Sequence, residues 1–126
     1  METPRSEIER LFQLQRQHAP RMAATGPEQR LDRLHRLKAW IFEHRGRIRS
    51  ALWDDFRKPH AESDLTEVFI PVHEIRHIMR RLRRWMAPKR VGPTLPLITT
   101  RSRVRYEPMG TNLILSPFNY PFLLVV

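Results

Sequence analysis

Apolar side chains recur every three or four residues along most of the chain, which is the spacing of amphipathic helices. The first group predicts a short helix over residues 7–18 that ends before Pro20. The second predicts a long helix that opens at Thr25-Gly26-Pro27-Glu28, a pattern typical of a capping box, and ends near Lys58-Pro59. Its expected core positions are Leu34, Leu37, Ile41, Ile48 and Leu52.

The clearest periodicity follows Ser63-Asp64, which offers a second helix cap. The apolar positions alternate steps of four and three and form one stripe: Val68, Val72, Ile75, Met79, Leu82 and Met86. Pro71 lacks a backbone donor, so this helix either kinks there or restarts with Pro71 in its first turn. Three tryptophans are expected to anchor helix packing: Trp40, Trp53 and Trp85.

The pattern changes after Pro88, where a loop rich in glycine and proline precedes two short strand-like segments. Val104 and Tyr106 alternate with arginines, as in a half-exposed strand. Glu107-Pro108-Met109-Gly110 suits a type I turn, after which residues 113–115 can return as a buried strand. The sequence therefore predicts a β-hairpin.

The composition is that of one globular domain, with 126 residues, 40% hydrophobic and 29% charged. There is no cysteine, which excludes disulfides and covalent thioester chemistry for this polypeptide alone. Four glycines, at positions 26, 46, 92 and 110, leave no P-loop and no GxGxxG turn. The N-terminal segment lacks the apolar core of a secretory signal, and no apolar run reaches bilayer length, so we expect a cytoplasmic protein.

His73-Glu74-Ile75-Arg76-His77 is a literal HExxH motif on a predicted helix, the spacing with which two imidazoles bind zinc around a carboxylate base. The apolar stripe, however, places His73 and His77 on the opposite, solvent-facing side. The extended zinc motif needs glycine and a third histidine where Arg80 and Arg83 stand, and nearby arginines would repel Zn²⁺. We therefore expect no metal site and keep a zinc hydrolase as the weaker alternative.

The net charge of +10 and the basic run at residues 80–90, which includes Trp85, are also compatible with a helical nucleic-acid-binding module. Leu82 and Met86 belong to the apolar stripe, so the arginines beside them are equally compatible with an ordinary solvent-exposed helix face. This alternative predicts nucleic-acid affinity that falls steeply with salt.

Asn119 lies in Ser116-Pro117-Phe118-Asn119-Tyr120-Pro121-Phe122, directly after an expected buried strand. Pro121 suits the first turn of a following helix, and asparagine is a preferred cap, so local physics favours a capping role for Asn119. The carboxyl end of a strand is also where open α/β folds place their ligands. Both interpretations of Asn119 stay open on local grounds.

Taken together, residues 106–110 and 113–122 resemble the YEPxG…IxSPWNYPF signature of aldehyde dehydrogenases, with Phe118 where tryptophan is usual. Upstream, Asp55-Phe56-Arg57-Lys58-Pro59 followed by Glu62 and Glu67, and residues 85–91, are similar to the helical arm of the branch with a short N-terminus. That branch includes fatty-aldehyde and aromatic-aldehyde enzymes. The resemblance covers about residues 28–126, and its two parts in order are far more specific than HExxH.

The resemblance implies an α/β fold, of which this segment supplies N-terminal helices, a β-hairpin and the start of the Rossmann-like cofactor domain. The expected divisions are an N-terminal helix and linker at 1–25, a helical arm at 26–90, and the hairpin with the first part of the cofactor-binding domain at 91–126. The family further implies a homo-oligomeric enzyme that acts on a small-molecule aldehyde, without nucleic acid as a partner.

The activity implied by the resemblance is aldehyde oxidation to a carboxylic acid with NAD or NADP. In the family a cysteine attacks the aldehyde, hydride passes to the nicotinamide, and a glutamate-activated water hydrolyses the thioester. Asn119 matches the asparagine whose amide donates to the oxyanion formed on attack. Ser116, Pro117, Phe118 and Asn119 match a loop that borders the nicotinamide end of the cofactor.

The sequence departs from the family pattern in what it lacks: the nucleophilic cysteine, the general-base glutamate and the glycine-rich cofactor turn all lie beyond Val126 in the family. We therefore expect this chain alone to be inactive, to bind no NAD(P) appreciably and to expose apolar surface. The apolar run at residues 122–126, which ends without a cap or a charge, also suggests a truncated chain. A gene fragment, a frameshift and a split enzyme are the alternatives.

Overall fold

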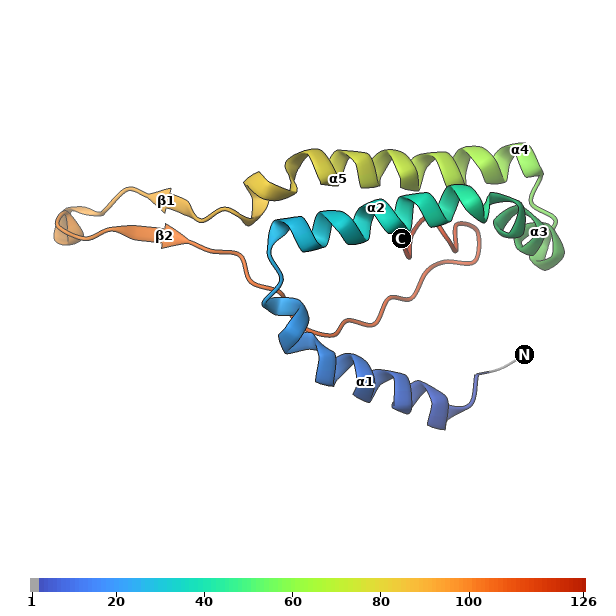
Figure 1. The fold of residues 1–126 in the computed structure, drawn as a ribbon, viewed down its shortest axis with the longest axis horizontal. Helices are drawn as coiled ribbons and strands as arrows, with labels where there is room; N and C mark the ends of the chain where they lie inside the picture. The colour runs from blue at the N-terminus through green and yellow to red at the C-terminus, as the bar shows by residue number, and fades with distance from the viewer. Residues whose placement is uncertain (1–2) are drawn as a thin grey trace. The chain divides into compact units, whose positions relative to one another are not determined.

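The computed structural model describes residues 3–126 and divides into two compact units, whose elements are drawn in Figure 1. The core unit contains Pro27–Arg83 and Ile114–Val126. The hairpin unit contains Arg84–Leu113 and the residues up to Gly26. None of the helices described in residues 3–126 is both long enough and apolar enough to cross a membrane.

The core unit is built from helices that follow one another closely. They are α2 (Pro27–Glu43), α3 (Arg45–Phe56), α4 (His60–Ser63), the π-helical η1 (Asp64–Phe69) and α5 (Ile70–Met86). Glu28, in the first turn of α2, accepts two hydrogen bonds of 2.7 and 2.8 Å from Arg83 near the end of α5. The helices α2 and α5 therefore run antiparallel, side by side (Figure 1).

The predicted apolar positions form the core of this unit. Its buried cluster comprises Ile41, Ile48, Leu52, Val68, Val72 and Ile75, with Leu34, Leu37, Met79 and Phe122 packed against it. The helical periodicity thus identified the core-facing side of each helix correctly. Phe122 joins this cluster from the C-terminal segment, so that segment is held against the helices by apolar contact as well as by polar contacts.

The single long helix predicted between residues 27 and 58 is wrong, because α2 and α3 are separated at His44. His44 has φ −98° and ψ 13°, and its ring stacks on Trp40 with centroids 4.3 Å apart. Gly46 follows in the first turn of α3, and glycine disfavours helix formation there. The bend brings Ile48 and Leu52 into the same core as Ile41.

The predicted cap at Ser63-Asp64 is also wrong, because the helix begins earlier, at His60, and Ser63 is fully buried within it. The alternatives left open for Pro71 are decided by η1, which places Pro71 second in α5. In a regular α-helix the Pro71 ring would clash with the carbonyl of Glu67, four residues earlier. The wider π turn removes this clash and lets the helical path continue.

The hairpin unit contains α1 (Arg5–Ala23), β1 (Lys89–Val91), a short 3-10 helix η2 (Leu95–Leu97) and β2 (Ser102–Val104). The helix α1 is longer than predicted and passes through Pro20, whose carbonyl accepts a bond from the amide of Ala24. A proline near the end of a helix removes only one backbone bond, so the last turn forms in spite of it.

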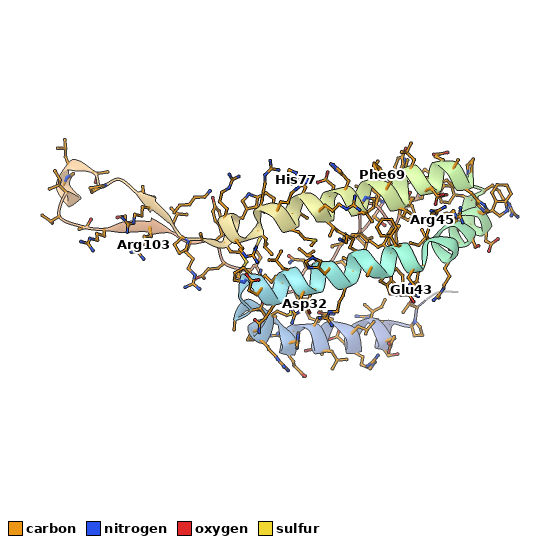
Figure 2. All side chains as sticks on the ribbon, turned by 45° about the horizontal axis from the view of Figure 1, so that its top comes forward. Asp32, Glu43, Arg45, Phe69, His77 and Arg103 are labelled. Carbon is orange, nitrogen blue, oxygen red and sulfur yellow. The ribbon has the colours of Figure 1, made fainter. Side chains whose placement is uncertain are left out.

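The predicted strand pairing is wrong. β2 pairs antiparallel with β1, with Arg90 opposite Arg103, and not with residues 113–115. Figure 2 shows Arg103 projecting from β2. Among the residues that the structure describes, no strand forms at 113–115, so the sheet described in residues 3–126 has two strands, and residues 105–126 contain only loops and turns. The start of a Rossmann-like sheet, expected from the resemblance, therefore stays a prediction.

The three tryptophans, which were expected to anchor helix packing, lie outside the buried core. Trp40, Trp53 and Trp85 are each exposed by 39% or more. Trp40 and Trp53 instead make surface contacts, with His44 stacked on Trp40 and His60 packed edge-on to Trp53. A tryptophan carries apolar area wherever it lies, so its presence alone does not locate the core.

Candidate functional site

The loop that contains Asn119 runs along the surface of the core unit and ends in one helix-like turn. Ser116 is half-buried, whereas Pro117, Phe118 and Asn119 are exposed. The turn is closed by the amide of Leu124, which donates to the carbonyl of Tyr120 at 3.3 Å, and by two similar bonds to the carbonyl of Phe122. The structure therefore brings the four predicted loop residues together at the start of this turn.

Beneath the loop lies a buried ion pair. Nζ of Lys58 contacts Oε1 of Glu67 at 2.6 Å, and the two side chains are exposed by only 2% and 0%. Charged groups are almost never buried this completely unless they are paired and hydrogen-bonded. The partners that complete this pairing come from the Asn119 loop.

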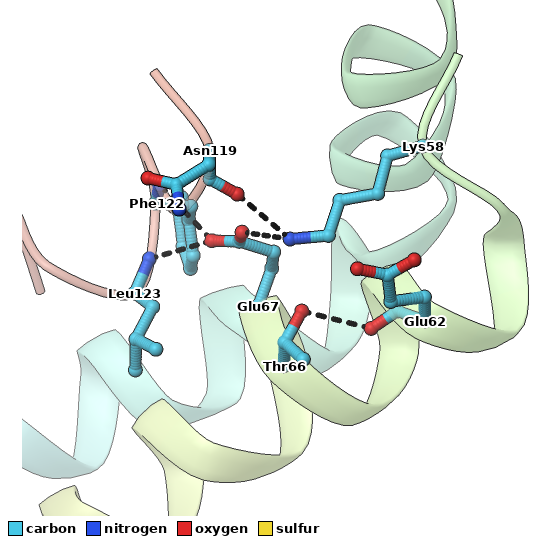
Figure 3. Close-up of polar contacts among 7 residues, drawn as sticks. All are labelled: Lys58, Glu62, Thr66, Glu67, Asn119, Phe122 and Leu123. Atoms are coloured by element: carbon cyan, nitrogen blue, oxygen red, sulfur yellow. Dashed lines mark hydrogen bonds and ion pairs between the residues drawn. The ribbon is translucent and has the colours of Figure 1, made fainter. Parts of the chain in front are cut away.

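Three hydrogen bonds join the ion pair to the loop (Figure 3). Lys58 donates to the backbone carbonyl of Asn119 at 3.0 Å. The amides of Phe122 and Leu123 donate to Oε2 of Glu67 at 3.1 and 2.7 Å. Nζ of Lys58 also lies 4.2 Å from the centre of the Tyr120 ring, a cation–π contact. The pair thus holds the backbone on both sides of Pro121.

These contacts bear on the capping role that local physics favours for Asn119. The free amides at the start of the turn are satisfied by the carboxylate of Glu67, which acts as a helix cap supplied from another element. No residue in the described part of the chain hydrogen-bonds the side-chain amide of Asn119. This amide is therefore exposed and has its donors available.

The local sequence explains how Lys58 reaches this position. α3 ends at Phe56, and the next residue, Arg57, adopts the left-handed conformation with φ 61° and ψ 31°. The turn directs the amide of Lys58 back to the carbonyl of Leu52 at 3.4 Å, and Pro59 then opens α4. The change of direction points the Lys58 side chain inward.

Further ion pairs hold α3 against η1, the helix that carries Glu67. Arg45 and Arg49 contact the two carboxylate oxygens of Asp64 at 3.1 and 3.2 Å. All three side chains are partly exposed, so each pair adds little stability by itself. Their geometry nonetheless fixes the ends of the two elements that supply the buried ion pair.

The sequence prediction of the site did not include the Lys58–Glu67 pair. Both residues belong to the upstream segment that resembles the aldehyde dehydrogenase arm, and this was the available signal. Hydrophobic periodicity assigns charged residues to the solvent face, so it could not indicate that Glu67, next to Val68, is buried. Two opposite charges nine residues apart also form no recognisable helical pair.

The HExxH residues lie apart from this site. His73 is exposed, as predicted, and its ring stacks on Phe69. His77 is half-buried, projects from α5 (Figure 2) and contacts the guanidinium of Arg81. Within residues 3–126 no group of three histidine, aspartate or glutamate side chains is arranged to hold a metal ion.

Some basic residues of the run at 80–90 are engaged within the chain. Arg83 is paired with Glu28, and Nζ of Lys89 lies 5.1 Å from the centre of the Tyr106 ring. The hydrogen bond from Arg83 lowers the pKa of Glu28 below its usual value. The arginines predicted to lie on a solvated helix face are exposed at positions 80, 81, 83 and 84.

Large apolar side chains are exposed on and beside the loop, as expected. Leu113 and Leu115 are exposed by 84% and 85%, and Phe118 by 86%. An apolar surface of this kind is typical of a segment that is covered by another part of a protein.

The loop offers hydrogen-bonding groups at the surface of the core unit. They include the backbone at residues 117–119 and the Asn119 amide, because these three residues are exposed. The four glycines, at positions 26, 46, 92 and 110, are far apart in the sequence, so they form no glycine-rich turn.

Comparisons with known proteins show which proteins this chain is similar to. A sequence model of the aldehyde dehydrogenase family matches residues 2–126. The chain is 38% identical over 122 residues, or 97% of its length, to AldX of Bacillus subtilis (strain 168), whose name assigns it to the aldehyde dehydrogenases. It is 35% identical over 101 residues, or 80% of its length, to aldehyde dehydrogenase family 3 member H1 of Arabidopsis thaliana.

A third relative is the 4,4'-diaponeurosporen-aldehyde dehydrogenase of Staphylococcus aureus (strain NCTC 8325 / PS 47), 38% identical over 96 residues and 76% of this chain. The chain spans only 27%, 21% and 21% of these three relatives, respectively. None of these matches supports the nucleic-acid-binding or zinc-hydrolase alternative.

Proposed function

The chain belongs to the aldehyde dehydrogenase family, and from this premise we propose that it supplies the oxyanion-binding loop of an enzyme that oxidises aldehydes to carboxylic acids with NAD or NADP. The family assignment makes the protein an oxidoreductase. The residue that we assign to the reaction is Asn119.

One observation carries the proposal: Asn119 is fixed by its backbone while its side-chain amide stays exposed and unbonded among the described residues. The backbone carbonyl is held by Lys58, and the following turn is capped by Glu67. An amide in this state has two donors free for a ligand and needs little reorganisation to bind it.

The chemistry that such an amide serves is the stabilisation of negative charge. When a nucleophile attacks an aldehyde, the carbonyl oxygen becomes an oxyanion, and a donor aimed at that oxygen binds the transition state more tightly than the ground state. Removal of one such donor typically costs about 3 kcal/mol of transition-state stabilisation. The attacking cysteine belongs, in this proposal, to a segment outside the present chain.

For the cofactor, we assign to Ser116, Pro117, Phe118 and Asn119 the border of the nicotinamide end. The cofactor, when bound, supplies the acceptor for the hydride that leaves the substrate. The residues of this chain contribute orientation and the exclusion of water, for which the exposed ring of Phe118 is suited. In this proposal, other segments of the whole enzyme bind the phosphates and determine the choice between NAD and NADP.

Under the same proposal, the present chain is inactive alone and the whole enzyme is a homo-oligomer. It keeps the division into residues 1–25, 26–90 and 91–126, in which the last part begins the cofactor-binding domain. The nucleotide sequence that follows this reading frame tests it directly. We expect it to encode a nucleophilic cysteine and a glycine-rich cofactor turn, in frame or after a frameshift, and unrelated sequence there would count against the proposal.

The role of Asn119 is tested in a chimera in which this chain replaces the matching segment of AldX. With Asn119→Ala, we expect kcat for aldehyde-dependent cofactor reduction to fall by about 10²–10³-fold, because one oxyanion donor is lost. The matched control is Asn112→Ala, since Asn112 is an exposed asparagine that donates only to the carbonyl of Gly110. An Asn119→Ala chimera with the kcat of its Asn112→Ala counterpart would refute the assignment.

A further inference from the structure

We propose that the buried Lys58–Glu67 pair is a positioning device that sets the Asn119 loop in its working conformation. The inference rests on the proposed role of Asn119 and extends it to two residues that touch no substrate. Lys58 and Glu67 are positioning residues, because they act through the backbone of the loop.

The burial of the pair indicates that it has a task beyond stability. Both side chains are withdrawn from solvent, with 2% and 0% exposure. Removing two charges from water is so unfavourable that apolar residues of similar volume often serve a core as well or better. A buried pair is therefore weak evidence for stabilisation and stronger evidence for a geometric requirement.

The geometric requirement is visible in the partners of the pair. Glu67 uses Oε1 for Lys58 and Oε2 for the amides of Phe122 and Leu123, so both oxygens are occupied. Lys58 spans the remaining distance to the carbonyl of Asn119. All three hydrogen bonds to the loop are to its backbone, and the Tyr120 ring adds a cation–π contact with Lys58. The pair thus fixes the path of the chain and leaves the side chain of Asn119 outward (Figure 3).

Two uncommon backbone conformations converge on this pair. Arg57, immediately before Lys58, has a positive φ, which is infrequent for a residue other than glycine. Glu67 lies in the π turn η1, a rare element that occurs often at functional sites. The π turn accommodates Pro71, and Glu67 is buried within it. The two conformations thus accompany the inward placement of both charged side chains.

The pair affects the proposed reaction through the position of the Asn119 amide. An oxyanion donor must lie about 2.7–3.1 Å from the developing oxyanion, and a misplacement of about 1 Å can lower a rate by roughly 10²-fold. A loop held by charged hydrogen bonds at residues 119, 122 and 123 has little freedom to shift.

The first test measures the loop directly in the chain itself. In the double variant Lys58→Met/Glu67→Gln both charges are removed together, so no unpaired charge remains buried. We expect the amides of Phe122 and Leu123 to lose about tenfold or more in hydrogen-exchange protection, while amides in α2 keep theirs. Glu28→Gln is the matched control, because it removes an exposed glutamate from an ion pair in the same unit. Unchanged protection at Phe122 and Leu123 in the double variant would overturn the proposal.

The second test is kinetic and uses the AldX chimera. We expect Lys58→Met/Glu67→Gln to lower kcat by about tenfold or more with little change in the KM for the cofactor, and Glu28→Gln to leave both unchanged. Lys58→Arg, which keeps the cation, should recover part of the lost kcat and of the loop protection. Equal loss in Lys58→Arg and Lys58→Met single variants would show that charge at this position is irrelevant and would refute the device.

The two tests also separate this inference from the proposed function. If Asn119→Ala lowers kcat but the double variant leaves both the loop amides and kcat unchanged, the role of Asn119 stands and the positioning role fails. If the double variant releases the loop amides while Asn119→Ala leaves kcat unchanged, the pair does hold the loop, and the proposed function of Asn119 fails.

Discussion

The two glutamates that pair with distant cations in the core unit occupy opposite environments, and the difference governs what each can contribute. Glu67 is fully buried and accepts three hydrogen bonds, one of them from Lys58. Glu28 is exposed and pairs with Arg83 at the surface. An exposed pair is screened by water and salt, so its contribution to stability is small. Removal of one partner from a buried pair is strongly destabilising, because it leaves an unpaired charge in the interior.

The surface pair gives a defined pH dependence. The hydrogen bond from Arg83, followed by its charge, lowers the pKa of Glu28 in the folded state. The resulting stabilisation is present above the pKa of Glu28 in the unfolded chain and is lost as the pH falls through the lower, folded value. In Arg83→Gln we expect the pKa of Glu28 to rise toward its usual value, as measured by NMR titration of the side-chain carboxyl carbon.

The control for this titration is Arg76→Gln, which removes an exposed cation from the same helix away from Glu28. It should leave the Glu28 titration where it is in the unaltered chain. If Arg76→Gln and Arg83→Gln shift the Glu28 pKa equally, the shift arises from overall charge and not from the ion pair.

The apolar residues of the core were predictable from sequence, whereas the polar centre of the unit was not. Ile41, Val72 and Ile75 are buried because helical spacing places them on one side, and spacing is a property of the sequence. Glu67 is buried because Lys58 and two amides of a loop more than fifty residues further along the chain reach it. Such compensation depends on the tertiary arrangement, which no local pattern encodes.

At the scale of elements, the errors in the predicted boundaries have a common cause. Sequence patterns indicated where helices lie but not how the chain passes between them at His44, Arg57 and Pro71. Each of these joints depends on the backbone conformation of a few residues, which helical periodicity does not encode. The strand β2, at residues 102–104, likewise pairs with β1, which precedes it in the sequence, and not with residues 113–115. Pairing depends on which backbone lies within hydrogen-bonding reach.

The left-handed joint after α3 permits a test of this strain. Glycine adopts positive φ at little cost, whereas a residue with a side chain pays about 1 kcal/mol or more. We therefore expect Arg57→Gly to raise the free energy of unfolding by about 1 kcal/mol, reduced by the loss of the contact between Arg57 and the ring of Trp53, 5.7 Å away. Urea denaturation followed by far-UV circular dichroism measures the change.

Arg57→Ala is the matched variant for this comparison. It loses the same contact with Trp53 but keeps the Cβ atom, so it should be less stable than Arg57→Gly and no more stable than the unaltered chain. Equal free energies of unfolding for the alanine and glycine variants would show that the left-handed conformation at Arg57 carries no strain.

At the scale of the whole molecule, the C-terminal turn has its polar groups paired, whereas the segment before it leaves apolar side chains exposed. The C-terminal turn of the core unit is capped by Glu67 and packed through Phe122. The residues before it, at 113–115, have neither a strand partner among the described residues nor apolar cover. A strand requires a neighbour for its amides and carbonyls, and an alternating apolar segment requires a face to pack on. Both needs are met in the proposed enzyme by a sheet of the cofactor-binding domain.

The segment at residues 113–115 should differ in hydrogen exchange between the chain alone and the chimera. In the 126-residue chain, we expect the amides of residues 113–115 to exchange with solvent rapidly, because no ladder holds them. In the AldX chimera the same amides should become protected by at least about tenfold, since each would gain an inter-strand hydrogen bond in a buried sheet. Hydrogen exchange followed by mass spectrometry on peptides covering this segment measures the difference. Residues 89–91, already paired with 102–104, serve as the internal reference and should change less. Rapid exchange at 113–115 in a catalytically active chimera would mean that this segment remains an unpaired connector in the working enzyme, and that the cofactor-binding sheet begins elsewhere.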